Sequence, residues 1–182
     1  MKTTIVTKNA PILRHTARPV PIRDISSKKI QSVLKRMKIA LKREDDGVAI
    51  AAPQIGESLR IFIISGRVQA IINNPLEKKR FPDTVFINPE ITKLSKEKIK
   101  VEEGCLSVPG FYEKVKRAEH IRVKALNKEG QSFEFEARDL LAVCVQHEMD
   151  HLNGKLFVDY ISSLKRQRIK KKLEKIHKME KS

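Results

Sequence analysis

The sequence predicts an α+β fold in which antiparallel sheets pack around one central helix. Several short stretches alternate apolar and polar residues and are joined by short turns, which is typical of antiparallel strands. One helical stretch carries a His-Glu-x-x-His motif at residues 147–151, a pattern in which a helix binds a metal ion. A helix near the N-terminus and a basic C-terminal helix complete the predicted architecture.

Length and composition predict a single domain followed by a tail. The chain has 182 residues, of which 40% are hydrophobic, and this is enough for one buried core. We place the domain at residues 1–163 and the basic tail at residues 164–182. No apolar run is long enough to span a membrane, and the first residues lack the apolar core of a signal peptide. We therefore expect a cytoplasmic protein without membrane contacts.

The elements before the central helix follow from local patterns. Residues 1–24 contain three prolines and are expected to form an irregular surface segment. Ser26 is expected to cap a helix that ends near Arg43, because the apolar residues between them recur at helical spacing. Strands are expected at residues 59–64, 84–87, 98–102, 112–117, 121–126 and 132–137. Asn88-Pro89 is expected to stop the second of these strands, and residues 127–130 to form a hairpin turn.

The central helix is expected to run from about Asp139, as its cap, to Leu152, with a stop at residues 153–154. His147 and His151 lie four residues apart, so they share one helix face and can bind the same metal ion. Glu148 is adjacent to the first histidine, where it can act as a general base toward a metal-bound water molecule.

A catalytic site of this kind needs a third protein ligand and an open position. Metzincin proteases place a third histidine six residues after the second, but Phe157 occupies that position here. Two alternatives remain on the residues alone. Glu174 lies in the lysine-rich tail, and its use would indicate an ordinary metalloprotease. Cys105 lies in a polar turn containing glycine, whereas Cys144 lies on the apolar helix and is expected to be a buried small side chain.

Residues 47–56 form a run of small side chains that includes Pro53 and the amide side chain of Gln54. Such a run allows the backbone to approach another group closely. On its own it indicates either a tight buried turn with a solvated Gln54, or the wall of a substrate cleft with Gln54 as a donor.

Three segments, at residues 47–54, 103–107 and 146–151, resemble in order and spacing the three motifs of peptide deformylases, and the C-terminal helix resembles that of the bacterial type 1 enzymes. The family patterns Glu-Gly-Cys-Leu-Ser and Gln-His-Glu-x-Asp-His match in full. In the pattern Gly-x-Gly-x-Ala-Ala-x-Gln, Ala49 replaces the second glycine. The resemblance covers the chain from about Pro11 to Asp159.

The resemblance implies an enzyme that removes the formyl group from N-formylmethionine of nascent polypeptides. It implies three metal ligands, which are Cys105, His147 and His151. It also implies Glu148 as general acid and base, and Gln54 with the backbone N–H of Leu106 as donors to the oxyanion. One divalent ion per chain is implied, Fe²⁺ by preference, with Zn²⁺, Ni²⁺ or Co²⁺ as substitutes.

An apolar pocket is expected beside the metal, and by the resemblance it accepts the methionine side chain. Its expected lining comes from the central helix and from the segments that carry the other site residues: Val48, Val101, Leu140, Val143 and Cys144. Ala49 is expected beside the substrate backbone, where its methyl group takes space that the family leaves open.

The formal net charge of +16 favours a polyanionic partner. Nine basic and two acidic residues lie between Leu164 and Ser182. We expect this tail to be a helix that docks on ribosomal RNA; the alternative is a frayed, solvated end. The candidate contacts are Lys165, Arg166, Arg168, Lys171, Lys172 and Lys175. A non-enzymatic protein associated with ribosomes or RNA is the corresponding alternative for the whole chain.

Overall fold

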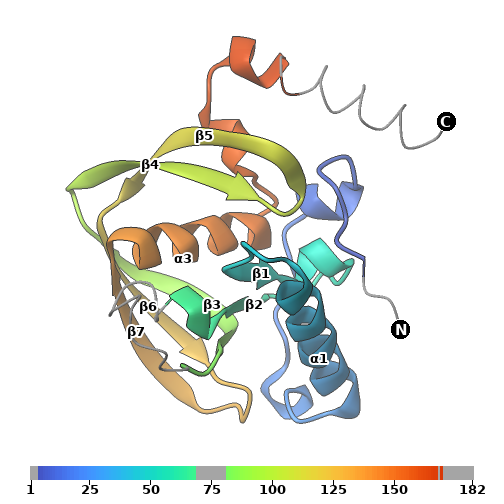
Figure 1. Cartoon of the computed structure of the whole chain (residues 1–182). Helices are drawn as coiled ribbons and strands as arrows, with labels where there is room; N and C mark the ends of the chain where they lie inside the picture. Colours follow the sequence, from blue (N-terminus) through green and yellow to red (C-terminus); the bar gives the residue numbers. More distant parts are fainter. Residues whose placement is uncertain (1–3, 69–80, 168, 170–182) are drawn as a thin grey trace, which may run out of the picture.

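The computed structural model describes residues 4–68, 81–167 and 169. Two antiparallel sheets lie on opposite sides of the helix α3, Asp139–Leu152 (Figure 1). The larger sheet has the order β1-β2-β3-β6-β7, with the strands Ala49–Ala51, Ile61–Ile64, Thr84–Leu94, His120–Leu126 and Ser132–Arg138. The smaller sheet pairs β4, Lys98–Cys105, with β5, Val108–Ala118. All pairings between these strands are antiparallel, so the predicted fold class is confirmed.

The helix α3 has the predicted bounds, but its N-terminal cap is a different residue. Asp139 is its first residue rather than its cap, and the preceding Arg138 makes no side-chain capping bond. The strand β7 ends directly at Arg138, so the chain turns at once into the helix, and Asp139 takes a φ of 48°. Asn153 caps the C-terminal end and Gly154 follows with a φ of 70°, as the stop signal predicts.

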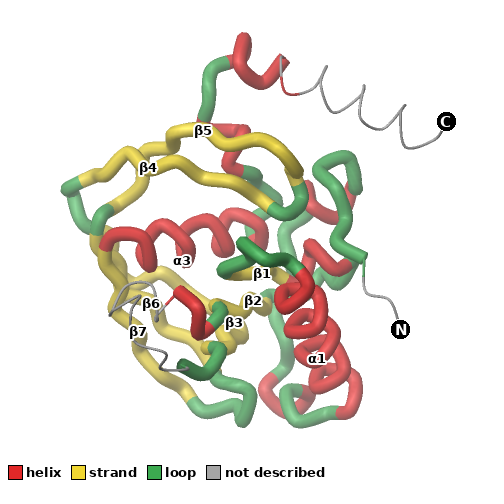
Figure 2. The backbone as a smooth tube through the Cα atoms, viewed as in Figure 1, coloured by secondary structure: helices red, strands yellow, loops and turns green. Residues whose placement is uncertain are grey.

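The helix α1, Lys28–Arg43, packs its apolar face against the larger sheet beside β1 (Figure 2). Its cap is Ser27 rather than Ser26, because the Ser27 hydroxyl accepts the backbone N–H of Ile30 at 3.3 Å. The predicted apolar stripe is buried, at Ile30, Val33, Leu34, Met37 and Leu41, and Ala40, which was not predicted, is buried beside it. They join Ile61 and Ile63 of β2 in one core cluster, which fixes the sheet edge next to the site.

The strand β3 does not stop at Asn88-Pro89, contrary to the prediction. It continues to Leu94, and the register with β6 shifts between Ile87 and Glu90. Asn88 takes a φ of 51°, and its side chain bonds both the N–H and the carbonyl of Val20, at 2.8 and 2.7 Å. A bulge therefore absorbs the two residues that would otherwise interrupt the ladder.

The N-terminal segment is not a surface segment throughout, because Leu13, Ala17 and Val20 are buried. The Ala17 N–H donates to the carbonyl of Leu152 at 2.9 Å, so the segment closes over the end of α3. Four 3-10 helices occur in the described residues: Pro11–Arg14, Ile22–Asp24, Ala52–Ile55 and Phe157–Tyr160. None of the helices described is both long enough and apolar enough to cross a bilayer.

Candidate active site and metal centre

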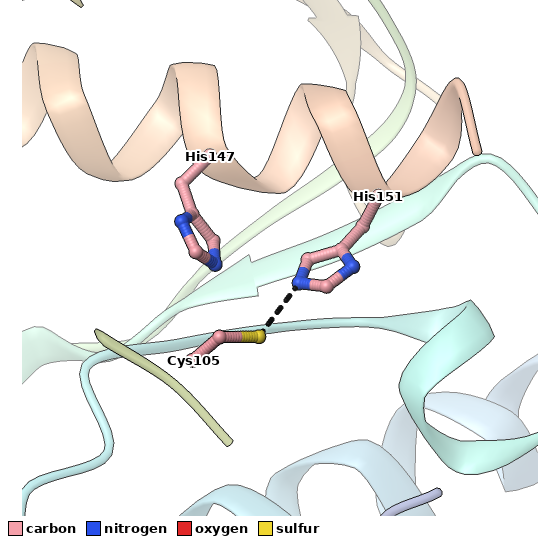
Figure 3. A group of neighbouring side chains, drawn as sticks. All are labelled: Cys105, His147 and His151. Atoms are coloured by element: carbon pink, nitrogen blue, oxygen red, sulfur yellow. Dashed lines mark hydrogen bonds between the residues drawn. The ribbon is translucent and has the colours of Figure 1, made fainter. Parts of the chain in front are cut away.

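Cys105, His147 and His151 converge between α3 and the end of β4 (Figure 3). One ligand atom from each lies within 4.8 Å of the other two. The Cys105 Sγ lies 3.2 Å from Nε2 of His151. Within the part of the chain that the structure describes, these three residues form the one group of His, Cys, Asp or Glu with such spacing. The structure therefore brings together the three predicted ligands.

The donor set fits a divalent transition metal ion. The Nδ1 of His147 lies 2.8 Å from Oε2 of Glu103, so the carboxylate fixes this nitrogen as the donor and leaves Nε2 for a metal. The buried Nδ1 of His151 has no hydrogen-bond partner among the described residues. A thiolate and two imidazoles leave one position open in a tetrahedral site and suit Zn²⁺, Fe²⁺, Ni²⁺ or Co²⁺.

Burial and neighbouring groups shift the pKa values of His147, His151 and Glu148. Burial opposes a charge on His147, but its bonds to Cys105 and Glu103 outweigh burial and raise its pKa. Burial and the neighbouring His147 lower the pKa of His151. Burial raises the pKa of Glu148 to about 7, which is the range in which a carboxyl group both accepts and returns a proton near neutral pH.

A cleft of about 390 Å³ opens at this cluster. Its walls include the predicted residues Val48, Ala49, Gln54, Cys105, Leu106, Leu140, Val143, Cys144, His147 and Glu148. Val101 is not part of the lining, contrary to the prediction. It shares a strand face with Glu103 and Cys105, but it precedes Cys105 by four residues, roughly 13 Å along an extended strand.

Residues 47–56 were expected to form either a tight buried turn or the wall of a substrate cleft, and Gln54 has features of both. It lies in a buried 3-10 helix, is 1% exposed and lines the cleft, so it is not solvated. Its Oε1 accepts the Ala51 N–H at 2.8 Å, and its Nε2 donates to Ser107 Oγ at 3.3 Å and to Cys105 Sγ at 3.7 Å. The last bond is long, so one N–H of Gln54 is available for redirection to a substrate oxygen. Leu106 lies in the tight turn where Cys105 pairs with Val108.

Sequence reasoning missed the polar network behind the histidines. Arg117 on β5 donates from Nε and Nη2 to the two oxygens of Glu103, at 2.6 and 3.0 Å, and from Nη1 to Asp150 Oδ2 at 2.6 Å. Glu103 could have been found, because it lies two residues before Cys105 and therefore on the same strand face. Nothing in the local sequence marks Arg117, since it reaches the site only through strand pairing.

The tail is described only in part. Residues 163–167 and 169 are helical, and Lys165 and Arg166 are exposed. Lys165 Nζ lies 2.8 Å from Glu113 Oε2 on β5. The other candidate RNA contacts, Arg168, Lys171, Lys172 and Lys175, lie outside the described residues, as does Glu174.

A cluster of two histidines and one cysteine with the buried carboxyl group of Glu148 beside it, at a cleft, is typical of a metal-dependent hydrolase. The family model described as polypeptide deformylase matches residues 2–167. A peptide deformylase from Stutzerimonas stutzeri is 46% identical over 170 residues, 93% of each chain. A crystal structure of a peptide deformylase from Legionella pneumophila superposes with a TM-score of 0.83, at 39% identity, and covers 99% of this chain and 98% of its own. A Met-Ala-Ser-bound class I type b peptide deformylase from Acinetobacter baumannii has a TM-score of 0.78 and 36% identity, covering 88% of this chain and 99% of its own.

The chain belongs to the polypeptide deformylase family. It is an enzyme that removes the formyl group from nascent polypeptides, and it belongs to a family of metalloenzymes. The comparisons do not favour the two alternatives, an ordinary metalloprotease and a non-enzymatic RNA-associated protein.

Proposed function

We propose that Cys105, His147 and His151 hold one divalent ion, Fe²⁺ by preference, and that the residues around it deformylate N-formylmethionyl peptides. The observation that carries this assignment is the convergence of the three ligand atoms within 4.8 Å at the cleft. When bound, the ion supplies a Lewis acid that makes water nucleophilic near neutral pH and polarises the formyl carbonyl. A formamide is a poor electrophile, so the reaction needs this activation.

Glu148 is the general base and then the general acid in this proposal. It is 3% exposed, lines the cleft, and its Oε2 has no hydrogen-bond partner among the described residues. This oxygen is therefore free to take the proton of the attacking water. The same carboxyl group then passes the proton to the leaving amine, which becomes the N-terminus of methionine.

Gln54 and the backbone N–H of Leu106 stabilise the oxyanion. Both residues line the cleft next to Cys105. The Ala51 N–H and the Ser107 hydroxyl hold the Gln54 amide in one orientation before substrate arrives. Donors fixed in advance act mainly on the transition state, and the loss of one typically costs about a hundredfold or more in rate.

The apolar wall of the cleft binds the methionine side chain. It is formed by Val48, Leu140, Val143 and Cys144, and Ala49 lies beside the peptide backbone. The relative with bound Met-Ala-Ser supports a peptide that begins with methionine, the product of deformylation, as a ligand of this cleft. Burying a methionine side chain stabilises binding by ~1.5–3 kcal/mol.

Residues 164–182 dock the enzyme on the ribosome, and residues 1–163 form the catalytic domain. The charge of the tail supports this division, because nine of its residues are basic. A formylated N-terminus appears as the nascent chain leaves the ribosome, so docking raises its effective concentration. A cytoplasmic location follows from the same substrate.

The test is formate release from formyl-Met-Ala-Ser by protein purified without oxygen, before and after metal removal with a chelator. We expect activity to disappear with the metal and to return with Fe²⁺, Ni²⁺ or Co²⁺. Iron-loaded enzyme should lose activity in air, because oxidants formed at Fe²⁺ attack the Cys105 thiolate, whereas nickel should protect it. Full activity without bound metal would contradict the proposal, and full activity of iron-loaded enzyme after hours in air would contradict the preference for iron.

A further inference from the structure

Tyr160 lies against the polar network that extends outward from the metal centre. Its ring covers the guanidinium of Arg117, whose Cζ lies 4.7 Å from the ring centre, and its hydroxyl donates to Asp150 Oδ1 at 2.8 Å. Arg117 donates to the other oxygen of Asp150, so Tyr160 contacts both members of one ion pair. We propose that Tyr160 is a positioning residue for the metal centre and acts on His147 through Arg117 and Glu103.

Unbroken contacts connect Tyr160 to the ligand. Arg117 holds both oxygens of Glu103 in a two-bond contact, which fixes the plane of that carboxylate. Glu103 Oε2 in turn lies 2.8 Å from Nδ1 of His147. The direction of the His147 ring therefore depends on where the guanidinium lies, and Tyr160 covers one face of the guanidinium.

The charges of the network explain why a tyrosine is needed there. The guanidinium of Arg117 forms ion pairs with two carboxylates, those of Glu103 and Asp150. The side chains of Arg117, Glu103 and Asp150 are only 5%, 3% and 13% exposed. Asp150 therefore needs a further donor, which the Tyr160 hydroxyl provides. Burial and the Asp150 carboxylate raise the pKa of Tyr160 to about 12, so this hydroxyl remains a donor at neutral pH. The ring also keeps water from competing for the Arg117 donors.

The local fold holds Tyr160 in register with the metal helix. Tyr160 ends the 3-10 helix Phe157–Tyr160, and the Phe157 ring stacks near His147, with centroids 6.2 Å apart and planes 25° apart. The same short helix thus touches the ligand directly through Phe157 and indirectly through Tyr160. This inference rests on the proposed ligand set.

The experiment uses the full chain loaded with Co²⁺ and the variants Tyr160→Phe and Tyr160→Leu. We measure the visible absorption of bound Co²⁺, its affinity by competition with a chelator, and the melting temperature. Outer partners of metal ligands typically contribute about 10–100-fold to affinity. We expect Tyr160→Leu to weaken Co²⁺ binding on the order of tenfold and to shift the absorption, and Tyr160→Phe, which keeps the ring, to cause a smaller change in the same direction.

The control is Phe133→Leu, which removes an aromatic contact with Phe86 in the core of the larger sheet. It should lower the melting temperature and leave Co²⁺ affinity and absorption unchanged. The inference is overturned if both Tyr160 variants lose thermal stability while their Co²⁺ affinity and absorption match those of the unaltered chain. If the unaltered chain binds no Co²⁺, the ligand set is wrong and this inference fails with it.

Discussion

The Nδ1 of His147 lies 2.8 Å from Oε2 of Glu103, so a residue of β4 orients a proposed metal ligand of α3 across 44 positions of sequence. This contact joins the smaller sheet to the central helix at the site itself. Cys105 comes from the same strand as Glu103. One strand therefore provides both a ligand and the group that orients a second ligand, and small shifts of that strand would disturb both.

Glu103→Gln is expected to weaken metal binding about 10–100-fold, because the amide is a poorer acceptor for the His147 N–H. It should also lower the free energy of unfolding by about 3–5 kcal/mol, since Arg117 loses a buried charged partner. Isothermal titration with Zn²⁺ and chemical denaturation measure the two effects. The matched control is Glu136→Gln, which breaks an exposed pair with Arg122 and should cost at most about 1 kcal/mol without changing metal affinity. Equal effects of the two variants would contradict the role of Glu103.

Cys105→Ser is expected to lose most of its metal and activity, whereas Cys144→Ala keeps the metal. Cys105 faces the two histidines, while Cys144 is 7% exposed on the apolar side of α3. Burial, followed by the charges of Glu148 and Glu103, raises the pKa of Cys144 to about 12. Cys144 is therefore almost entirely a thiol at pH 8 and should resist alkylation there. The measurement is the metal content per chain of the two variants. An equal loss of metal in both would mean that the sulfur ligand is assigned wrongly.

Glu148→Gln is expected to keep its metal and to lose turnover about 10²–10⁴-fold, because an amide cannot accept and return a proton. Both imidazoles and the thiolate remain in this variant. Metal content and formate release should be measured on the same sample, with Glu129→Gln in the exposed hairpin turn as the control. Substantial formate release by metal-loaded Glu148→Gln would exclude Glu148 from proton transfer.

The sequence predicted the parts of the fold and site that depend on local spacing. His147 and His151 fall on one face because a helix repeats every 3.6 residues, and alternation was enough to locate β4, β5, β6 and β7. The strand β1, Ala49–Ala51, was not predicted. The hairpin at residues 127–130 was also marked by its turn residues, and Asn127 and Gln131 pair across it.

The features that were missed depend on contacts between distant residues. Asn88 looks like a strand stop, but its hydrogen bonds with Val20 turn the interruption into a bulge. Arg117 carries no local signal, since only the pairing of β5 with β4 and the packing of α3 bring it between Glu103 and Asp150. Val101 was predicted to line the cleft because it lies on the same strand face as Cys105. Alternation predicts that face, but it does not predict how far along β4 the cleft extends.

Val143→Ala is expected to raise KM for formyl-Met-Ala-Ser several-fold while leaving kcat nearly unchanged. Val143 lines the cleft, and each apolar carbon removed from contact with the methionine side chain costs about 0.8 kcal/mol of binding. Val101→Ala is the matched control, because Val101 does not line the cleft and should leave KM as it is. In addition, the enzyme should prefer formyl-Met over formyl-Asp peptides. Equal efficiency with both peptides, or equal KM changes in the two variants, would remove the apolar wall from substrate binding.

Removal of the basic tail is expected to weaken ribosome binding without abolishing hydrolysis of free peptides. The position of the truncation matters, because Ile169 is 7% exposed and packs with Val115 and Phe157. A chain ending at Ser163 loses this contact and up to ~1.5–3 kcal/mol of stability, whereas a chain ending at Ile169 keeps it.

Comparing the two truncated chains therefore separates the effect of charge from that of stability. Six basic residues follow Ile169, so both truncated chains should co-sediment with ribosomes less than the full chain, and the difference should shrink as salt is raised. Both should still release formate from formyl-Met-Ala-Ser, because every proposed catalytic residue precedes Leu164. If all three chains co-sediment equally across the salt series, the tail has no docking role. If only the chain ending at Ser163 loses binding, the contact lies among Lys165, Arg166 and Arg168, which the longer truncated chain keeps, rather than in the six basic residues after Ile169.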